Sequence, residues 1–284
     1  MVIEPFTIFI YVATFIVGLI VGSFLNVCIY RIPTKDLSIH SPRHSFCPSC
    51  GNRVRVYDNI PVLSYLILGG KCRYCKAKIS VQYPLVEFLT GAFLLLFLYT
   101  FQLSLTFVVA CIFFSILIAI SAIDLRHFII PNELVFTGMI IALIFAIITA
   151  IVEGKPIYLI YGIVGMFIGG GIILAIAWLG KLFLRREAMG MGDVKLMAMI
   201  GMYLSWWPYQ HSTFLNYLFR SIRVLMLVLF ISAFVGAVIG TIAMLFRKNE
   251  SRHVIPYGPF LAAGAILTLL YGEKIWMWYL GFLS

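Results

Sequence analysis

Long runs of apolar residues, separated by short polar segments, make up most of this 284-residue chain. A helix that crosses the hydrocarbon core of a bilayer needs about 20 predominantly apolar residues. We therefore predict transmembrane helices at 6–30, 83–101, 103–123, 129–152, 157–180, 190–207, 222–246 and 256–283. The segment 190–207 is the weakest of these predictions, because it is short and begins with glycines. The pattern predicts an all-α polytopic membrane protein of about eight helices.

One long polar segment interrupts the apolar pattern. Residues 31–82 contain nine of the Lys and Arg residues, two of the four Asp residues and several turn-forming stretches such as "RIPTKD". We therefore divide the chain into three parts, which are a first transmembrane helix at 1–30, a small extramembrane domain at 31–82 and a seven-helix membrane domain at 83–284.

Composition agrees with a membrane protein, and the charges give its orientation. The chain is 62% hydrophobic and only 11% charged, with a formal net charge of +10. Such a charge often indicates nucleic acid, but in a membrane protein it more often reflects positive cytoplasmic loops. Alternating spans place 17 of the 21 Lys and Arg residues on one side. We expect that side, with 31–82, to be cytoplasmic, both termini to lie outside, and no nucleic-acid partner.

The polar domain contains two C-x2-C motifs, "CPSC" and "CRYC". Two such hooks bring four thiolates around one tetrahedral ion, as in a closed structural zinc site. Two disulfides or four free thiols are the alternatives, and a cytoplasmic location disfavours disulfides. A metal would also stabilise a domain of this small size. The expected ligands of one structural zinc ion are Cys47, Cys50, Cys72 and Cys75.

Two aspartates flank predicted spans. Asp124 lies at the end of the third span, and Asp193 opens the sixth. An aspartate inside a span costs about 2.5–3.5 kcal/mol on insertion scales, and less near the interface. Helix capping, or pairing with Arg126 or Lys195, would explain each residue separately. The predicted topology nevertheless places both at similar depth on the cytoplasmic side, which favours a shared function.

Two carboxylates on one membrane face are typical of an aspartic protease. Close carboxylates do not both ionise easily, so the pair shares one proton. The ionised member activates water, and the protonated member donates to the scissile carbonyl. Gly190 and Gly192, just before Asp193, would let a peptide backbone approach closely. Pro131 is expected to break the chain beyond Asp124.

Two other classes of function explain the pattern less well. A proton-coupled transporter would use the aspartates as a relay, but transporters usually show internal repeats and charges at the midplane. We find no convincing repeat. A zinc-bearing scaffold without chemistry would leave the two aspartates and their glycines without a role. Serine catalysis is disfavoured because the sequence contains no G-x-S-x-G motif.

Several blocks, taken in order, resemble one known family. This family is the type IV prepilin peptidases, the leader peptidases and N-methyltransferases of bacterial type IV pilus, type II secretion and competence systems. They belong to the wider class of G-x-G-D intramembrane aspartic peptidases. The similar blocks are "GSFLNVCIYRIP", "SPRHSFCPSC", "DNIPVLSYL", "CRYCKAKIS", "QYPLVEFLTG", "IDLRHFIIPNEL", "GMGDVKLMA" and "IPYGPFLAAG".

The resemblance implies an activity and a location. Asp124 and Asp193 match the family's catalytic pair, and the four cysteines match its metal ligands. The substrates would be prepilins or pseudopilins, cleaved after the Gly of a short basic leader at the cytoplasmic face of the inner membrane. The new N-terminal residue would be methylated with S-adenosylmethionine. A peptidase without methyltransferase activity is the alternative, and membrane lipid is the other expected partner.

Four further positions have weaker assignments. Glu87, just inside the second span, either serves methyl transfer or pairs with a loop arginine. Lys195 points to a different helix face from Asp193, and we expect it to have a structural or lipid-headgroup role. Asn132 stands where family members often carry Asp. The segment 208–223 looks longer than the usual link between spans, and we interpret it as a periplasmic amphipathic insert.

Overall fold

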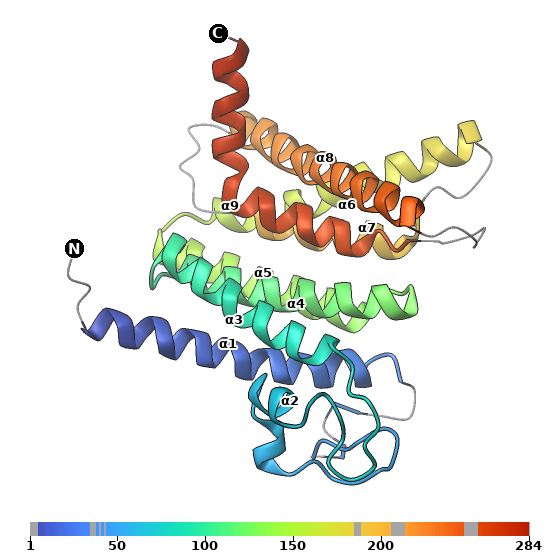
Figure 1. The fold of residues 1–284 in the computed structure, drawn as a ribbon. Coiled ribbons are helices and arrows are strands. Elements are labelled where there is room, and N and C mark those ends of the chain that lie inside the picture. Colours follow the sequence, from blue (N-terminus) through green and yellow to red (C-terminus); the bar gives the residue numbers. More distant parts are fainter. Residues whose placement is uncertain are drawn as a thin grey trace. The chain divides into compact units, whose positions relative to one another are not determined.

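The structure is a computed structural model that describes residues 5–34, 38–39, 41–42, 44–184, 189–205, 214–246 and 255–283. These residues are mostly helical (Figure 1). The elements are α1 (Pro5–Arg31), the 3-10 helix η1 (Val56–Asn59), α2 (Leu63–Ile67), α3 (Gln82–Phe101), α4 (Leu105–His127), α5 (Asn132–Val152), α6 (Ile157–Leu184), α7 (Met191–Ser205), α8 (Phe214–Phe246) and α9 (Gly258–Leu283). By length and composition, seven of them can cross a membrane, namely α1, α3, α4, α5, α6, α8 and α9. The prediction of a helical membrane protein is confirmed.

Helix α7 differs from the other predicted spans. It contains 15 residues, which corresponds to about 22 Å at 1.5 Å per residue, whereas the hydrocarbon core is about 30 Å thick. Every residue from Met199 to Ser205 is buried. Within its unit, α7 contacts α5, α6, α8 and α9. Helix α7 is therefore surrounded by other helices of the protein. It can be shorter than a helix that faces lipid across the whole hydrocarbon core. Residues 206 and 207 of the predicted span lie outside the described residues.

Helix α8 begins earlier than the sequence predicted. We expected a span from 222, but the helix begins at Phe214. The described part of the proposed insert, 214–223, thus forms the first turns of α8. Residues 208–213 lie outside the described residues.

The chain forms two compact units, Met1–Ala119 and Ile120–Ser284, and α4 contributes to both. In the first unit, α1 and α3 pack through small residues. A Cβ added to Gly18 would lie 2.6 Å from the Cα of Gly91, and one added to Gly22 would lie 2.6 Å from the Cα of Glu87. Glycines four positions apart thus allow the two helix backbones to approach closely, as is common in membranes.

Arg31 connects α1 to the polar segment that follows it. Its side chain is buried at 4% exposure. The guanidinium donates hydrogen bonds to the backbone carbonyls of Ser38, Ile39, Pro42 and His44, over 2.7–3.2 Å. A single cation thus satisfies four carbonyls and fixes the start of the loop against the end of the helix.

In the second unit, α6 and α7 make the closest helix contact. A Cβ on Gly165 would lie 2.5 Å from the carbonyl oxygen of Gly201, and a Cβ on Gly201 would clash with the carbonyl oxygen of Gly165. Gly169 packs against the backbone of Met197 in the same way. This close contact holds α7 at a fixed position in the unit, and Asp193 lies in its first turn.

Candidate functional site

Asp124 lies in the last turn of α4, and Asp193 lies in the first turn of α7. Both belong to the second unit. Helix α4 ends with Phe128 in the left-handed conformation at φ 54°, and its N–H donates to the carbonyl of Asp124 over 2.9 Å. Pro131 is the extended N-cap of α5. The chain therefore turns within four residues of Asp124 and leaves its side chain facing α7 and α9.

Asp124 is buried at 5% exposure and is held by a residue distant in sequence. The N–H of Gly258, at the start of α9, donates a hydrogen bond to Asp124 Oδ2 over 3.1 Å. A Cβ added to Gly258 would lie only 2.5 Å from the same oxygen. The carboxylate therefore occupies the space that a side chain at position 258 would need.

Asp193 follows the two glycines that the sequence singled out. Its N–H donates to the carbonyl of Gly190 over 3.1 Å. A Cβ at Gly190 would lie 3.6 Å from Asp193 Oδ2, which is ordinary contact, so local packing does not require glycine there. At Gly192, however, a Cβ would lie 3.1 Å from the Cβ of Ile130. The charges of Asp193 and Asp124 are close enough to interact.

Ile130 packs between Gly192, which precedes Asp193, and Gly258, which contacts Asp124. Its side chain would meet a Cβ on Gly192 at 3.1 Å and a Cβ on Gly258 at 3.5 Å. One apolar side chain thus spaces the starts of α7 and α9 around the end of α4. This arrangement brings Asp124 and Asp193 together.

Two residues beside the carboxylates received no role from the sequence alone, and both belong to the block "IPYGPFLAAG". Gly258 contacts Asp124, while the hydroxyl of Tyr257 forms a hydrogen bond with Ser232 of α8 and lies within electrostatic range of Asp193. The available signal was a Gly-Pro pair opening the last apolar run, which is typical of a helix start.

Lys195 lies on a different face of α7 from Asp193, as its spacing predicted. Its Nζ donates a hydrogen bond to Asn132 Oδ1 over 2.9 Å. The contact joins the first turns of α7 and α5. It gives Lys195 a structural partner at the position where relatives were expected to carry Asp.

In the first unit, the four predicted cysteines lie together. Each pair of their sulfur atoms lies within 4.8 Å, and Cys47 Sγ and Cys75 Sγ are 3.9 Å apart. In each hook, a backbone N–H reaches back to the first cysteine's carbonyl, from Gly51 to Cys47 and from Lys76 to Cys72. Four sulfur donors at these separations can hold one metal ion, with every ligand supplied by the protein.

Backbone N–H groups favour the thiolate form of Cys72, the first cysteine of the second hook. N–H groups of Cys75 and Tyr74 lower the pKa of the Cys72 thiol to about 7, and thiolate is the form that binds metal. Arg73, between the two cysteines, donates to Asp58 of η1 over 2.5 and 2.8 Å. This ion pair lowers the pKa of Asp58 and ties the hook to the segment before it.

Glu87, at 8% exposure, faces the same polar segment. Its Oε2 accepts a hydrogen bond from the N–H of Val62 over 2.8 Å, and Ser23 is a second partner. Val62 is the N-cap of α2 and has a φ of 60°. The sequence offered Glu87 either a role in methyl transfer or a loop arginine as partner. In the described residues it holds the backbone at the start of α2.

Two family models match the chain. The "Bacterial Peptidase A24 N-terminal domain" matches residues 16–101, and the "Type IV leader peptidase family" matches residues 111–241. The first range contains both cysteine hooks and Glu87, and the second contains both aspartates.

Relatives match over nearly their whole length. The chain is 33% identical to a "Prepilin leader peptidase/N-methyltransferase" of Stutzerimonas stutzeri, with 94% of this chain and 92% of that protein covered. It is also 33% identical to the protein of that name in Pseudomonas aeruginosa, covering 95% and 93%. The corresponding Aeromonas hydrophila protein is 31% identical, covering 94% and 92%. No solved structure matches the chain.

Proposed function

Because the chain belongs to the type IV leader peptidase family, we propose that it cleaves the leader of prepilins or pseudopilins and N-methylates the new N-terminus. The observation that carries the peptidase assignment is the meeting of Asp124 and Asp193. The two residues are 69 positions apart in the sequence, and their charges interact at the junction of α4, α7 and α9. A buried carboxylate beside a second one is the arrangement that aspartic peptidases use.

The proposed cleavage needs one proton on the pair. The ionised aspartate accepts a proton from water, whose oxygen attacks the scissile carbonyl, while the protonated aspartate donates to the carbonyl oxygen. The carbon–nitrogen bond then breaks as a proton passes to the leaving amine. The hydrogen bond from Gly258 orients Asp124 throughout. No bond forms between enzyme and substrate.

The surroundings of the pair favour an extended substrate backbone. Gly190 carries no side chain beside the Asp193 carboxyl, and its Cβ position has ordinary contact distances only. We propose that this side is left open for the peptide, whereas Gly192 and Gly258 are closed by Ile130. The hydrophobic helix of the substrate would pack along the spans, and this orientation would supply much of the rate.

We assign zinc to the four cysteines. A tetrahedral zinc ion with Zn–S bonds of about 2.3 Å requires sulfur atoms about 3.8 Å apart, and the cysteine sulfurs lie at distances compatible with this geometry. The ligands would be Cys47, Cys50, Cys72 and Cys75. Because no position is left for water, the ion would stabilise the domain.

Methylation requires a donor, for which we propose S-adenosylmethionine. It would supply a methyl group to the α-amino group that cleavage exposes. We assign no residue to this cosubstrate. Glu87 is engaged by Val62 and is better explained as a support for the polar segment.

The remaining assignments follow from charge and family. We propose that the enzyme lies in the bacterial inner membrane, with 31–82 and the aspartates on the cytoplasmic side and both termini outside. Its three parts would be 1–30, 31–82 and 83–284. Membrane lipid is the surrounding partner, and nucleic acid has no role.

The proposed function is tested with purified protein in micelles, a prepilin substrate and S-adenosylmethionine. Mass spectrometry should show loss of the leader and, only when the methyl donor is present, addition of one methyl group. A prepilin with its leader Gly replaced is the matched substrate control and should stay intact. Cleavage without methylation would support the peptidase-only alternative. If the prepilin with its natural leader also stays intact, the proposal is contradicted.

A further inference from the structure

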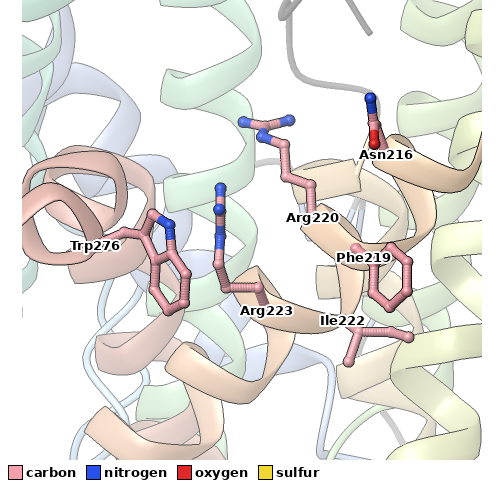
Figure 2. A pocket seen from close by; sticks show the side chains of 6 residues that line it. All are labelled: Asn216, Phe219, Arg220, Ile222, Arg223 and Trp276. Carbon is pink, nitrogen blue, oxygen red and sulfur yellow. The ribbon is translucent and has the colours of Figure 1, made fainter. Parts of the chain in front are cut away.

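A pocket lies between the first turns of α8 and the second half of α9, and no role described above uses it (Figure 2). Its volume is about 590 Å³. The lining residues are Asn216, Phe219, Arg220, Ile222, Arg223 and Trp276. Five of these belong to the segment 208–223 that the sequence marked as unusual.

Two arginines give the pocket its charge. Arg220 and Arg223 are three positions apart on α8, and Figure 2 shows their guanidinium groups extending in the same direction. Arg220 Nε lies 3.1 Å and Arg223 Nη2 lies 3.5 Å from the same atom, Oε1 of Glu273. Among the described residues, two positive charges thus share one carboxylate, so this cluster carries more positive than negative charge beside the pocket.

Both guanidinium groups are partly removed from water. The side chain of Arg220 is 13% exposed, and that of Arg223 is 29% exposed. The guanidinium carbon of Arg223 lies 4.6 Å from the centroid of the Trp276 ring, a cation–π distance that fixes the side chain. The arginines are therefore held in place by neighbours on α9.

The pocket lies at a helix end that is typical of a membrane interface. Arg220 is about 9 Å along α8 from Phe214 at 1.5 Å per residue, and charges deeper in a span are costly. The second half of α9 carries Tyr271, Trp276, Trp278 and Tyr279. Aromatic residues of this kind concentrate at the level of lipid headgroups.

The pocket is also separate from the carboxylate pair. Gly258, which contacts Asp124, begins α9, whereas Glu273 lies 15 positions later. Fifteen helical residues correspond to a path of about 22 Å. A ligand in the pocket would therefore bind near the opposite end of α9 from the proposed peptidase site.

We infer that this pocket binds the phosphate-bearing headgroup of an anionic phospholipid. The two guanidinium groups supply directed donors and excess positive charge for a phosphate. Phe219 and Ile222, on the neighbouring face of α8, supply apolar surface for the start of an acyl chain (Figure 2). A headgroup with a net negative charge is favoured over a zwitterionic one because the cluster has a net positive charge.

The inference assigns opposite effects to the partners in the ion-pair cluster. R220Q/R223Q removes the cation excess and should weaken phospholipid binding. E273Q removes the competing carboxylate but keeps both guanidinium groups, so it should retain or strengthen binding. K155Q removes one positive charge from an exposed position after α5 and is the matched control for the single variants R220Q and R223Q. None of these residues belongs to the carboxylate pair or the cysteine cluster.

The test is native mass spectrometry of the full chain in micelles with phosphatidylglycerol, phosphatidylcholine or inorganic phosphate. Wild type and K155Q should retain phosphatidylglycerol in preference to phosphatidylcholine. R220Q/R223Q should bind phosphatidylglycerol at least about tenfold more weakly than wild type. E273Q should bind it at least as well as wild type. Single R220Q and R223Q variants and the melting temperature of each protein distinguish lost binding from lost folding.

Three results would overturn the inference. The first is that a folded R220Q/R223Q protein binds phosphatidylglycerol as wild type does, and the second is that wild type retains phosphatidylcholine as well as phosphatidylglycerol. The third is that inorganic phosphate occupies the pocket and phosphatidylglycerol does not displace it. The last would identify free phosphate, and not lipid, as the source of the anion.

Discussion

The backbone N–H of Gly258 donates a hydrogen bond to Oδ2 of Asp124 over 3.1 Å, although 134 positions separate the two residues. The contact joins the start of the last helix to the end of the fourth. It also leaves no room for a side chain at position 258. The geometry of the carboxylate pair therefore depends on a residue that carries no reactive group.

A G258A variant should lose most peptidase activity. The added Cβ would lie 2.5 Å from Asp124 Oδ2, so the carboxylate or the start of α9 must move. A displacement of about 1 Å at a reacting group can reduce the rate by about a hundredfold. Leader removal by the purified variant measures the effect.

The matched control for this variant is G171A in α6, where an added Cβ meets nothing within 4 Å. It should cleave at close to the wild-type rate. Methylation of a pre-cleaved pilin should survive in both variants. Wild-type cleavage by G258A would show that the contact does not control the geometry of the pair.

Replacing Cys72 by Ser should release the metal. Three thiolates and a hydroxyl form a weaker zinc site than four thiolates, and this small domain gains folding free energy from the ion. Elemental analysis should give about one zinc per wild-type chain and a substoichiometric content for C72S. The polar segment 31–82 should also become more sensitive to protease.

C111A is the control, because Cys111 lies in α4 outside the cysteine cluster. It should keep its zinc and its protease resistance. Wild-type protein that is purified without any metal, yet remains folded and active, would refute the zinc assignment.

Glu87 distinguishes a structural role from a role in methyl transfer. E87Q keeps an oxygen that accepts from the N–H of Val62, so both reactions should continue within about threefold of the wild-type rate. E87A leaves that N–H without its acceptor, a loss of about 1–3 kcal/mol, and should loosen 31–82 in limited proteolysis. E133Q, at an exposed glutamate of α5, is the control. If E87Q cleaves but does not methylate, the carboxylate itself serves methyl transfer.

Asn132→Asp should strengthen the link between α5 and α7. The substitution replaces the acceptor of the 2.9 Å hydrogen bond from Lys195 by a carboxylate. An exposed ion pair of this kind contributes about 0.2–1 kcal/mol, so the melting temperature should rise slightly without loss of cleavage. In a K195M background the gain should be smaller, because only the interaction of the new carboxylate with the N-terminus of α5 remains. An equal gain with and without Lys195 would exclude this pairing as its cause.

The sequence predicted those features that depend on local pattern. Apolar runs predicted the helices, and the spacing of the two C-x2-C motifs predicted a cluster that the structure contains. The alternation of spans also predicted that Asp124 and Asp193 lie on one side of the membrane, and this stays a prediction. Each prediction needed only the order of residues and the thickness of a bilayer.

Features that depend on distant partners were missed. Arg220 and Arg223 made this part of the sequence look like a polar link, but both pair with Glu273 of α9, and the described helix α8 begins at Phe214. The role of Gly258 was not visible in the sequence, because its backbone N–H makes the hydrogen bond and its lack of a side chain leaves room for the Asp124 carboxylate. Neither property appears in a pattern of hydrophobic and polar residues.

The central claim is that Asp124 and Asp193 together perform peptide cleavage, and single Asn variants test it most directly. Asparagine keeps the size of each side chain and the acceptor for Gly258, but removes the ionisable group. Purified wild type, D124N and D193N would be compared with prepilin for leader removal and, separately, with pre-cleaved pilin for methylation. The account predicts that each variant loses cleavage and still methylates. Cleavage by either variant at close to the wild-type rate would contradict it.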